Sequence, residues 1–280
     1  MSEALQIENL TKSYGTNTVI KDISFAVRRG EIFALLGVNG AGKTTTLECI
    51  EGIREYDSGN ITVNGSIGVQ LQSSSLPANI KAIEAYQLFC KWRKVQIDLE
   101  LFNAFDLMQL KNKQYREMST GQKRRLHLAL ALIGDPDIIF LDEPTAGLDV
   151  EGRASLHSQI RQLKVQGKTI IMASHDMAEV ENLCDRIAIL KGGKIAFNGS
   201  IVGLTSEMAG QSRIYIKTER PLQNADYEQE YCVFTSTNIG DTLYELLKIC
   251  KQTDNTVIDI KIERATLEQK FMDIARSGKP

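Results

Sequence analysis

The chain has 280 residues, a formal net charge of -2 and 42% hydrophobic residues. This composition is typical of a soluble globular protein with one large domain and a smaller appendage, and it excludes disordered, collagenous and membrane-spanning classes. With 33 basic and 35 acidic residues the chain has no overall basic field to hold a nucleic-acid backbone, so we expect no nucleic-acid partner.

Cysteine usage and the N-terminus indicate a compartment. The five cysteines are scattered and none has CxxC spacing, which argues against a disulfide framework and a zinc site. The first residues, MSEALQIENLTKSYG, lack the basic start and apolar run of a signal peptide. No window approaches the roughly 18 uninterrupted apolar residues of a membrane span. We therefore expect a cytoplasmic chain without a direct membrane span.

The first part of the chain predicts strands. Apolar and polar residues alternate around 5–7 and 23–27, which predicts two half-buried antiparallel strands at one edge. The run 32–36 is apolar throughout, as in a strand covered on both faces, and it leads into a glycine-rich stretch. From about residue 77 to 113 the apolar spacing is helical, which predicts a helical insertion.

The later elements predict a parallel sheet and an appendage. Two apolar runs, 138–141 and 170–173, flank an amphipathic helical pattern, and a strand–helix–strand order implies parallel strands. Gly192-Gly193 lies between two further short runs and suits the tight turn of a hairpin. After about residue 205, short alternating strands and two amphipathic helices predict a small α+β appendage.

A phosphate site is predicted after the first buried strand. The sequence from Gly37 to Thr44, GVNGAGKT, fits GxxxxGK[ST] and precedes a plausible helix. The glycines let successive N–H groups point at phosphate oxygens, and the helix N-terminus adds its positive dipole end. Lys43 would reach the β- and γ-phosphates, and Thr44 would ligate Mg²⁺. The predicted ATP-contacting residues of this loop are Gly37, Asn39, Gly40, Ala41, Gly42, Lys43, Thr44 and Thr45.

A carboxylate pair follows the second buried strand. Asp142 and Glu143 come at its C-terminal end, where open α/β sheets bind ligands. Asp142 would hold Mg²⁺ through its water shell, and Glu143 would polarise the attacking water. One alternative stays open, because an Asp-Glu pair before Pro144 also suits the start of a helix.

Three further motifs complete a pattern. Residues 118–125 are MSTGQKRR, residues 145–149 are TAGLD, and His175 lies just beyond a strand. Here the sequence resembles the ATP-binding cassette family, whose signature is LSGGQ and whose Walker B segment continues into EPTxGLD and a switch histidine. The resemblance covers about residues 1–205. Its motifs in this order are far more specific than a lone phosphate loop.

The resemblance implies a fold with two domains. Residues 1–205 would be an α/β P-loop cassette with a mixed central sheet, an antiparallel β subdomain and a helical subdomain over about 76–130. Residues 206–280 would be a small C-terminal α+β domain.

The resemblance also implies roles for single residues. Tyr14 matches the aromatic residue that stacks on adenine, although an edge-strand aromatic is an alternative. Gln72 matches the glutamine that senses Mg²⁺ and water, with Gln70 as the register alternative. His175 matches the residue that contacts the γ-phosphate and helps to hold Glu143. The implied catalytic residues are Glu143, His175 and Gln72, and the implied metal site is Thr44, Gln72 and Asp142.

The signature segment has a structural and a functional interpretation. Ser119 and Gln122 have the spacing of a capping box, and a capped helix N-terminus is also an anion site. The resemblance implies that Ser119, Gly121 and Gln122 meet the ATP bound by another subunit, and that Asp149 acts across the dimer. Thr120 replaces the first glycine of the signature. A β-branched residue adopts a positive φ only at a cost and narrows the space beside the phosphate, so we expect activity to survive, because Ser119 and Gly121 keep their contacts, but closure to be weaker.

The implied function is that of an ATPase subunit. The resemblance implies Mg²⁺-dependent hydrolysis of ATP to ADP and phosphate, coupled to transport through a separate transmembrane permease. The partner cassette is a second copy or a different chain, and the subunit would lie peripherally on the inner face of the cell membrane. The ending RATLEQKF, residues 264–271, resembles the TLEDVF-like ending of ABC-2-type drug, polysaccharide or antibiotic exporters, which favours export; an amphipathic terminal helix is the alternative.

Other functions are weighed against transport. A soluble ABC ATPase acting on ribosomes or DNA is the main alternative, but such proteins usually carry paired cassettes, long coiled coils or basic arms, and this sequence shows none. A P-loop GTPase is disfavoured because residues 112–115, NKQY, lack the aspartate of the NKxD motif. A small-molecule kinase would not need the Ser119 segment.

Overall fold

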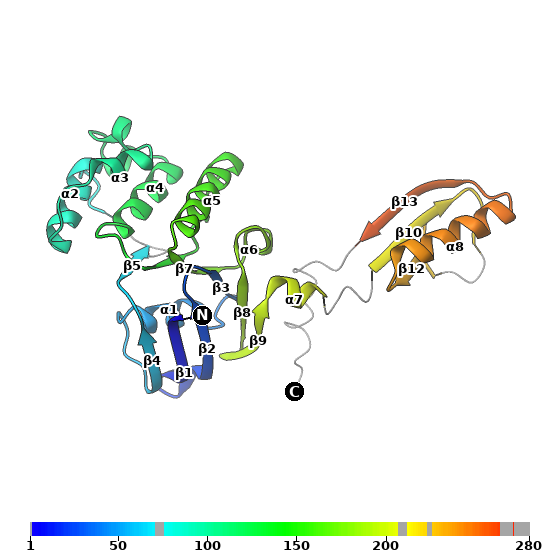
Figure 1. Ribbon diagram of the computed structural model, residues 1–280, viewed down its shortest axis with the longest axis horizontal. Helices are drawn as coiled ribbons and strands as arrows, with labels where there is room; N and C mark the ends of the chain where they lie inside the picture. Colours follow the sequence, from blue (N-terminus) through cyan, green and yellow to red (C-terminus); the bar gives the residue numbers. More distant parts are fainter. Residues whose placement is uncertain (1, 71–75, 207–211, 223–225, 264–270, 272–280) are drawn as a thin grey trace. The chain divides into compact units, whose positions relative to one another are not determined.

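The chain divides into two compact units, Met1–Asn198 and Gly199–Pro280. The computed structural model describes residues 2–70, 76–206, 212–222, 226–263 and 271, with the backbone only for 205 and 206 (Figure 1). The domain limits expected from the sequence, 1–205 and 206–280, stay a prediction.

An antiparallel sheet at the start of the first unit confirms the two strands predicted there. Strand β1 (Glu3–Tyr14) pairs antiparallel with β2 (Asn17–Arg28) on one side and with β4 (Ser58–Val63) on the other. Each strand buries some of its residues and exposes others, with strict alternation only over stretches such as Ile23, Phe25 and Val27, because β-bulges interrupt the pairing of β1 with β2.

A six-stranded sheet in the order β5-β6-β7-β3-β8-β9 forms the centre of the first unit. Its five neighbouring strands from β5 to β8 pair in parallel, which confirms the predicted parallel sheet. The glycine pair Gly192-Gly193 has φ values of 54° and 83° and joins β8 to β9 as the predicted hairpin. The strands are β3 (Ile32–Gly37), β5 (Ile67–Gln70), β6 (Ile138–Asp142), β7 (Thr169–Ser174), β8 (Arg186–Lys191) and β9 (Lys194–Ser200).

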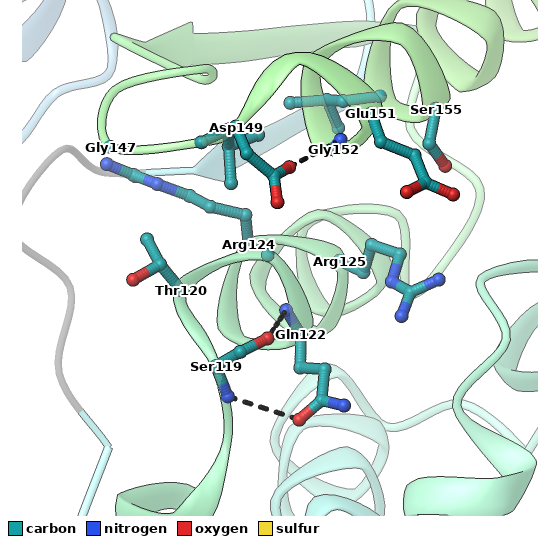
Figure 2. A pocket seen from close by; sticks show the side chains of 13 residues that line it. Ser119, Thr120, Gln122, Arg124, Arg125, Gly147, Asp149, Glu151, Gly152 and Ser155 are labelled. Atoms are coloured by element: carbon teal, nitrogen blue, oxygen red, sulfur yellow. Dashed lines mark hydrogen bonds between the residues drawn. The ribbon is translucent and has the colours of Figure 1, made fainter.

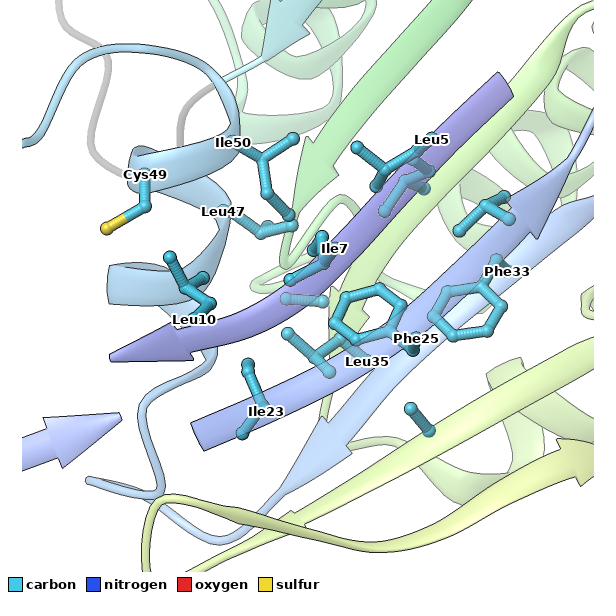
Figure 3. Close-up of a cluster of buried hydrophobic side chains, with 14 of the residues drawn as sticks. Leu5, Ile7, Leu10, Ile23, Phe25, Phe33, Leu35, Leu47, Cys49 and Ile50 are labelled. Carbon is cyan, nitrogen blue, oxygen red and sulfur yellow. The ribbon is translucent and has the colours of Figure 1, made fainter. Parts of the chain in front are cut away.

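The main core lies between the antiparallel sheet, helix α1 (Lys43–Ile50) and the central sheet (Figure 3). Phe25 of β2 stacks on Phe33 of β3 with ring centroids 5.4 Å apart. Leu47 and Ile50 of α1 are buried in the same cluster. Burying each such side chain contributes about 1.5–3 kcal/mol, so this core fixes β3 and α1, the two elements that flank the glycine-rich loop.

Helices between β5 and β6 confirm the helical insertion that was predicted from the apolar spacing of about residues 77–113. The helices α2 (Ala82–Arg93), α3 (Leu99–Ala104) and α4 (Thr120–Ala131) lie together in Figure 1. Tyr86 of α2 packs on Phe102 of α3 with ring centroids 5.0 Å apart, and its hydroxyl donates to the Asp98 carbonyl at 2.7 Å. Two short 3-10 helices, Met108–Leu110 and Tyr115–Glu117, connect α3 to α4.

The remaining helices of the first unit accompany β7. Helix α5 (Val150–Val165) precedes this strand, and α6 (Met177–Leu183) follows it. Among the residues that the structure describes, none of the helices is long and apolar enough to span a membrane.

The described part of the second unit is α+β, as predicted. Its sheet has the order β11-β12-β10-β13, with antiparallel neighbours throughout. Helix α8 contributes Leu246 and Cys250 to a core with Ile214 and Ile216 of β10. The elements are α7 (Ile201–Ser206), β10 (Ser212–Thr218), β11 (Asp226–Glu228), β12 (Tyr231–Ser236), α8 (Ile239–Gln252) and β13 (Val257–Glu263). The second predicted helix and the exporter-like ending lie outside the described residues apart from Phe271.

Candidate nucleotide site

The glycine-rich loop joins buried strand β3 to helix α1. Gly40 and Gly42 have φ values of 80° and 105°, a region that other residues adopt at a cost. A Cβ at Gly37 would lie 2.8 Å from the Leu190 carbonyl oxygen. The loop therefore needs glycine at these positions. It curls around the Lys43 ammonium, which donates to the carbonyl of Gly37 at 2.7 Å.

Lys43 is a desolvated cation beside two carboxylates. Burial lowers the pKa of Lys43, whereas the charges of Glu143 and Asp142 raise it. Burial also disfavours the charged form of Asp142 and so raises its pKa. The Thr44 hydroxyl opposes this rise by donating to the Asp142 carboxylate at 3.2 Å. Bonds from the Lys43 ammonium to negatively charged phosphate oxygens would be stronger than its bonds to neutral backbone carbonyls. The site can therefore exchange those carbonyls for an anionic ligand.

Oxygen donors around Asp142 fit a hard divalent cation. Asp142 Oδ1 is buried and has no hydrogen-bond partner among the described residues. The side-chain oxygen and nitrogen of Gln70 are also buried without a partner among these residues. Gln70 ends β5, next to Leu141 of β6. A hydrated Mg²⁺ prefers carboxylate and hydroxyl oxygens, so the Asp142 carboxylate and the neighbouring Thr44 hydroxyl fit it. Gln70, by contrast, shares a sheet face with Leu141 and not with Asp142. Gln72, the expected glutamine, lies outside the described residues.

Glu143 and His175 form a close pair. His175 Nδ1 lies 2.8 Å from Glu143 Oε1 and 2.6 Å from Oε2. Glu143 has a φ of 50°, and its N–H donates to the Ala173 carbonyl at 3.0 Å. A left-handed glutamate costs on the order of 1 kcal/mol, and such strain is concentrated at functional sites. The bond to Ala173 holds the Glu143 backbone, and the contact with His175 holds its carboxylate.

The alternative interpretation of this acid pair, the start of a helix, is wrong. Strand β6 ends at Asp142, and the next helix, α5, begins only at Val150. The reason is that Glu143 adopts a left-handed φ, which an α-helix cannot include.

Ser119 lies in a separate cavity of about 480 Å³ (Figure 2). Its Oγ accepts from the Gln122 N–H at 3.2 Å, and Gln122 Oε1 accepts from the Ser119 N–H at 3.1 Å. This is the predicted capping box of α4, and it leaves the first turn of the helix facing the cavity. The lining residues are Ser119, Thr120, Gly121, Gln122, Arg124, Arg125, Gly147, Leu148, Asp149, Glu151, Gly152, Ser155 and Leu156.

Asp149 faces the same cavity from the start of α5. Its carboxylate accepts from the Gly152 N–H at 2.8 Å and so caps that helix. Arg153, one turn further, donates to the Leu148 carbonyl at 3.3 Å and forms an ion pair of 3.0 Å with Asp176. Arg153 therefore links Asp176, the residue after His175, to the loop that carries Asp149.

Thr120 does not have the backbone conformation that the comparison with the signature glycine suggested. It is the first residue of α4 and is not among the residues with positive φ. The expected backbone cost of a β-branched residue here is therefore wrong, because a helical first turn suits negative φ. A Cβ at Gly147 would lie 3.5 Å from Thr120 Cγ2, so the threonine side chain occupies space beside that glycine.

Tyr14 ends β1 and is 43% exposed. The guanidinium of Arg54 lies 5.3 Å from its ring centroid and the ammonium of Lys12 lies 5.5 Å away. Both the adenine-stacking role and the edge-strand alternative are compatible with this placement, and the role stays a prediction.

The residues predicted to bind nucleotide or to act in catalysis thus lie in three separate parts of the first unit. Lys43, Thr44, Asp142, Glu143 and His175 form one cluster at the carboxyl ends of β3, β6 and β7. Ser119, Gly121, Gln122 and Asp149 line the cavity in Figure 2. Tyr14 belongs to neither group.

Two supporting residues carry no motif and were missed by sequence reasoning. Lys113 donates to Gln122 Oε1 at 3.0 Å, and Arg153 binds Asp176 as described. The only available signal was the helical offset of Arg153 from Asp149, which is too common to be specific.

The chain is similar to known proteins in sequence and in fold. The family profile described as ABC transporter matches residues 20–146. An uncharacterized ABC transporter ATP-binding protein of Methanocaldococcus jannaschii is 39% identical over 75% of this chain and 82% of its own length. The linearmycin resistance ATP-binding protein of Bacillus subtilis is 36% identical over 76% and 74%. The Nod factor export ATP-binding protein I of Rhizobium etli is 37% identical over 74% and 71%. A solved ATP-binding subunit of an ABC transporter superposes with a TM-score of 0.67 at 26% identity, covering 73% of this chain and 92% of that one.

Proposed function

Because the chain belongs to the family of ABC transporter ATP-binding proteins, we propose that it hydrolyses MgATP between two cassettes and thereby drives a separate permease that exports its substrate. The observation that carries the proposal is the division of the site. The cluster around Lys43 and Glu143 combines a cation with a carboxylate–imidazole pair, which supports triphosphate binding and hydrolysis there, whereas the capped helix at Ser119 lines a different cavity. In a head-to-tail dimer, the Ser119 helix of one copy would face the Lys43–Glu143 cluster of the other copy.

The proposed chemistry assigns each group a task. Lys43 would leave the Gly37 carbonyl and bind the β- and γ-phosphates. Thr44 and Asp142 would hold Mg²⁺, which would supply positive charge to the phosphates. Glu143 accepts a proton from the attacking water, and His175 holds that carboxylate in place. The positive end of α4 at Ser119 and Gly121 of the neighbouring copy stabilises the γ-phosphate.

Hydrolysis would couple to a permease through the helices between β5 and β6. Leu88 and Trp92 of α2 are 54% and 71% exposed, and residues four positions apart share a helix face. An exposed apolar pair of this kind fits a binding surface for another protein. In the sequence, Gln72 lies between β5 and α2, and we propose that closure around ATP is transmitted to this surface.

The names of relatives support export. The relatives from Bacillus subtilis and Rhizobium etli are named for linearmycin resistance and for Nod factor export. The alternative, a soluble ATPase acting on ribosomes or DNA, gains no support from these names. Peripheral association with the inner face of the membrane follows from the proposed permease.

The decisive experiment replaces the proposed base. Glu143→Gln removes the proton acceptor but keeps the shape, so the variant should bind ATP, lose at least about a hundredfold in turnover and accumulate as an ATP-bound dimer. Phosphate release measures turnover, and the amount of ATP that stays bound to the chain through gel filtration measures the trapped, ATP-bound state. The matched control is Glu100→Gln, an exposed glutamate of α3, which should behave as wild type. Unchanged turnover of Glu143→Gln would exclude Glu143 as the base.

Coupling has its own test. Trp92→Ser should leave ATPase activity of the isolated chain unchanged and reduce copurification with the membrane protein that accompanies the wild-type chain. If wild type copurifies with ribosomes or DNA instead of a polytopic membrane protein, the transport assignment is refuted.

A further inference from the structure

Strand β13 is an edge strand of the C-terminal sheet in the part of the chain that the structure describes. The sheet has the order β11-β12-β10-β13, and among the described residues β13 pairs with β10 alone. At the opposite edge, β11 is only three residues long and wholly charged or aromatic, whereas β13 runs over seven residues from Val257 to Glu263. An unpaired edge strand exposes N–H and C=O groups that can pair with another chain.

The edge strand carries apolar side chains that helix α8 does not cover. Ile260 and Ile262 lie opposite Ile216 and Ile214 of β10, which are buried in the core under α8. Directly opposed residues point to the same face of a sheet, so all four face the helix. Yet Ile260 and Ile262 are 36% and 43% exposed. The apolar face therefore extends beyond α8 onto the edge.

The charged residues of the same strand lie on the other face and have opposite signs. Asp259 and Lys261 flank Ile260 symmetrically. Asp259 accepts from the Tyr231 hydroxyl at 2.6 Å, and the Lys261 ammonium lies 4.3 Å from the Tyr231 ring centroid. The Lys261 ammonium and the Asp259 carboxylate lie 3.9 Å apart within one chain, and their side chains are 57% and 42% exposed, so both groups are accessible to a further partner.

We propose that β13 pairs antiparallel with β13 of a second copy of this chain, in the register that places Ile260 opposite the Ile260 of that copy. The dimer axis then runs through Ile260, and Asp259 of each chain faces Lys261 of the other. Opposite charges directly across two strands stabilise the pairing, and the exposed isoleucines of the two chains form one apolar strip.

Charge complementarity also selects this register over its neighbours. A shift that keeps the α8 faces on one side moves the axis to Asp259 or to Lys261. The first places two aspartates opposite each other, and the second places two lysines opposite each other and Asp259 opposite Glu263. Like charges directly opposed are destabilising. A regular ladder from Asp259 to Glu263 with β10 supports the extended geometry that the pairing needs.

Charge reversal tests the proposal in the full-length chain without nucleotide and with EDTA, so that ATP-driven association of the cassettes does not contribute. Wild type should be dimeric by sedimentation. Asp259→Lys and Lys261→Asp should each weaken the dimer about tenfold or more, because each places like charges opposite each other. Mixing the two variants should restore dimers, since the two lysines of the first variant then face the two aspartates of the second. A fold defect in either variant would not be repaired by mixing.

Cysteine crosslinking gives an independent measurement of the register. Ile260→Cys places two thiols opposite each other and should form a disulfide-linked dimer on mild oxidation. The matched control is Ile262→Cys on the same face, whose two copies would be about 13 Å apart and should not crosslink. Wild type reports the background of the five native cysteines. A nucleotide-free monomer, unchanged dimers in both charge variants, failure of mixing to restore dimers, or crosslinking at residue 262 in place of 260 would each overturn the proposal. None of these outcomes depends on ATP hydrolysis, so they leave the proposed function untouched.

Discussion

Ser119→Asp separates the two roles of Ser119, capping of α4 and contact with the ATP of the other cassette. Ser119 Oγ accepts from the Gln122 N–H at 3.2 Å, and loss of such a cap in Ser119→Ala should lower the free energy of unfolding by about 1 kcal/mol. Aspartate is an equally good cap and its charge favours a helix N-terminus by about 0.3–1 kcal/mol. Ser119→Asp should therefore be as stable as wild type or slightly more stable.

The ATPase rate of Ser119→Asp should fall, although its stability is maintained. If the α4 N-terminus meets the γ-phosphate, an added carboxylate about 4 Å from it costs about 4 kcal/mol at an effective dielectric constant of 20. That corresponds to a loss of roughly a thousandfold in ATPase rate. Ser119→Asn, a neutral cap, is the matched control and should lose far less. Urea unfolding and phosphate release at saturating MgATP give both quantities. A stable Ser119→Asp protein with wild-type turnover would refute the proposed contact.

Two further predictions concern pH and the signature segment. Burial, together with the charges of Arg124 and Lys123, lowers the pKa of His127 from 6.5 to about 4, so His127 is neutral in the folded chain and protonated in the unfolded chain between these values. Its contribution to stability is present above pH 6.5 and is lost as pH falls, by about 2 kcal/mol from pH 7 to pH 5. The pH dependence of urea unfolding should shrink by this amount in His127→Gln; an unchanged pH dependence would contradict it. Thr120→Gly should cost at most about 1 kcal/mol in stability, since Thr120 is in the first turn of α4, and should maintain or raise the ATPase rate. A large loss of rate would show that the threonine is needed.

Local structure was predictable from the sequence wherever a residue type meets a strict local demand. The glycines of 37–42 and the spacing of Ser119 to Gln122 each specify a backbone conformation or a hydrogen bond within a few residues, and the structure contains both. The alternation of β1 and β2 and the continuous apolar runs of β3, β6 and β7 likewise determine which strands are half-buried and which are fully buried.

Features set by distant parts of the chain were not predictable. The left-handed φ of Glu143 depends on its bond to Ala173 of another strand, and a helix start was an equally good local interpretation. The cavity at Ser119 needs α4 and α5 side by side, which no local pattern encodes. The open edge at β13 emerges only from the strand order, because isoleucines alternating with charges are equally typical of a paired strand.

Complementation between two inactive variants tests the composite site most directly. Lys43→Ala should remove phosphate binding in its own chain, and Ser119→Asp should impair only the site completed by that chain, so either variant alone forms no intact site. A mixture should regain ATPase activity, because a dimer of one copy of each contains one site with wild-type Lys43 and wild-type Ser119. If both residues served the ATP of their own chain, every chain in the mixture would be defective and no activity would return.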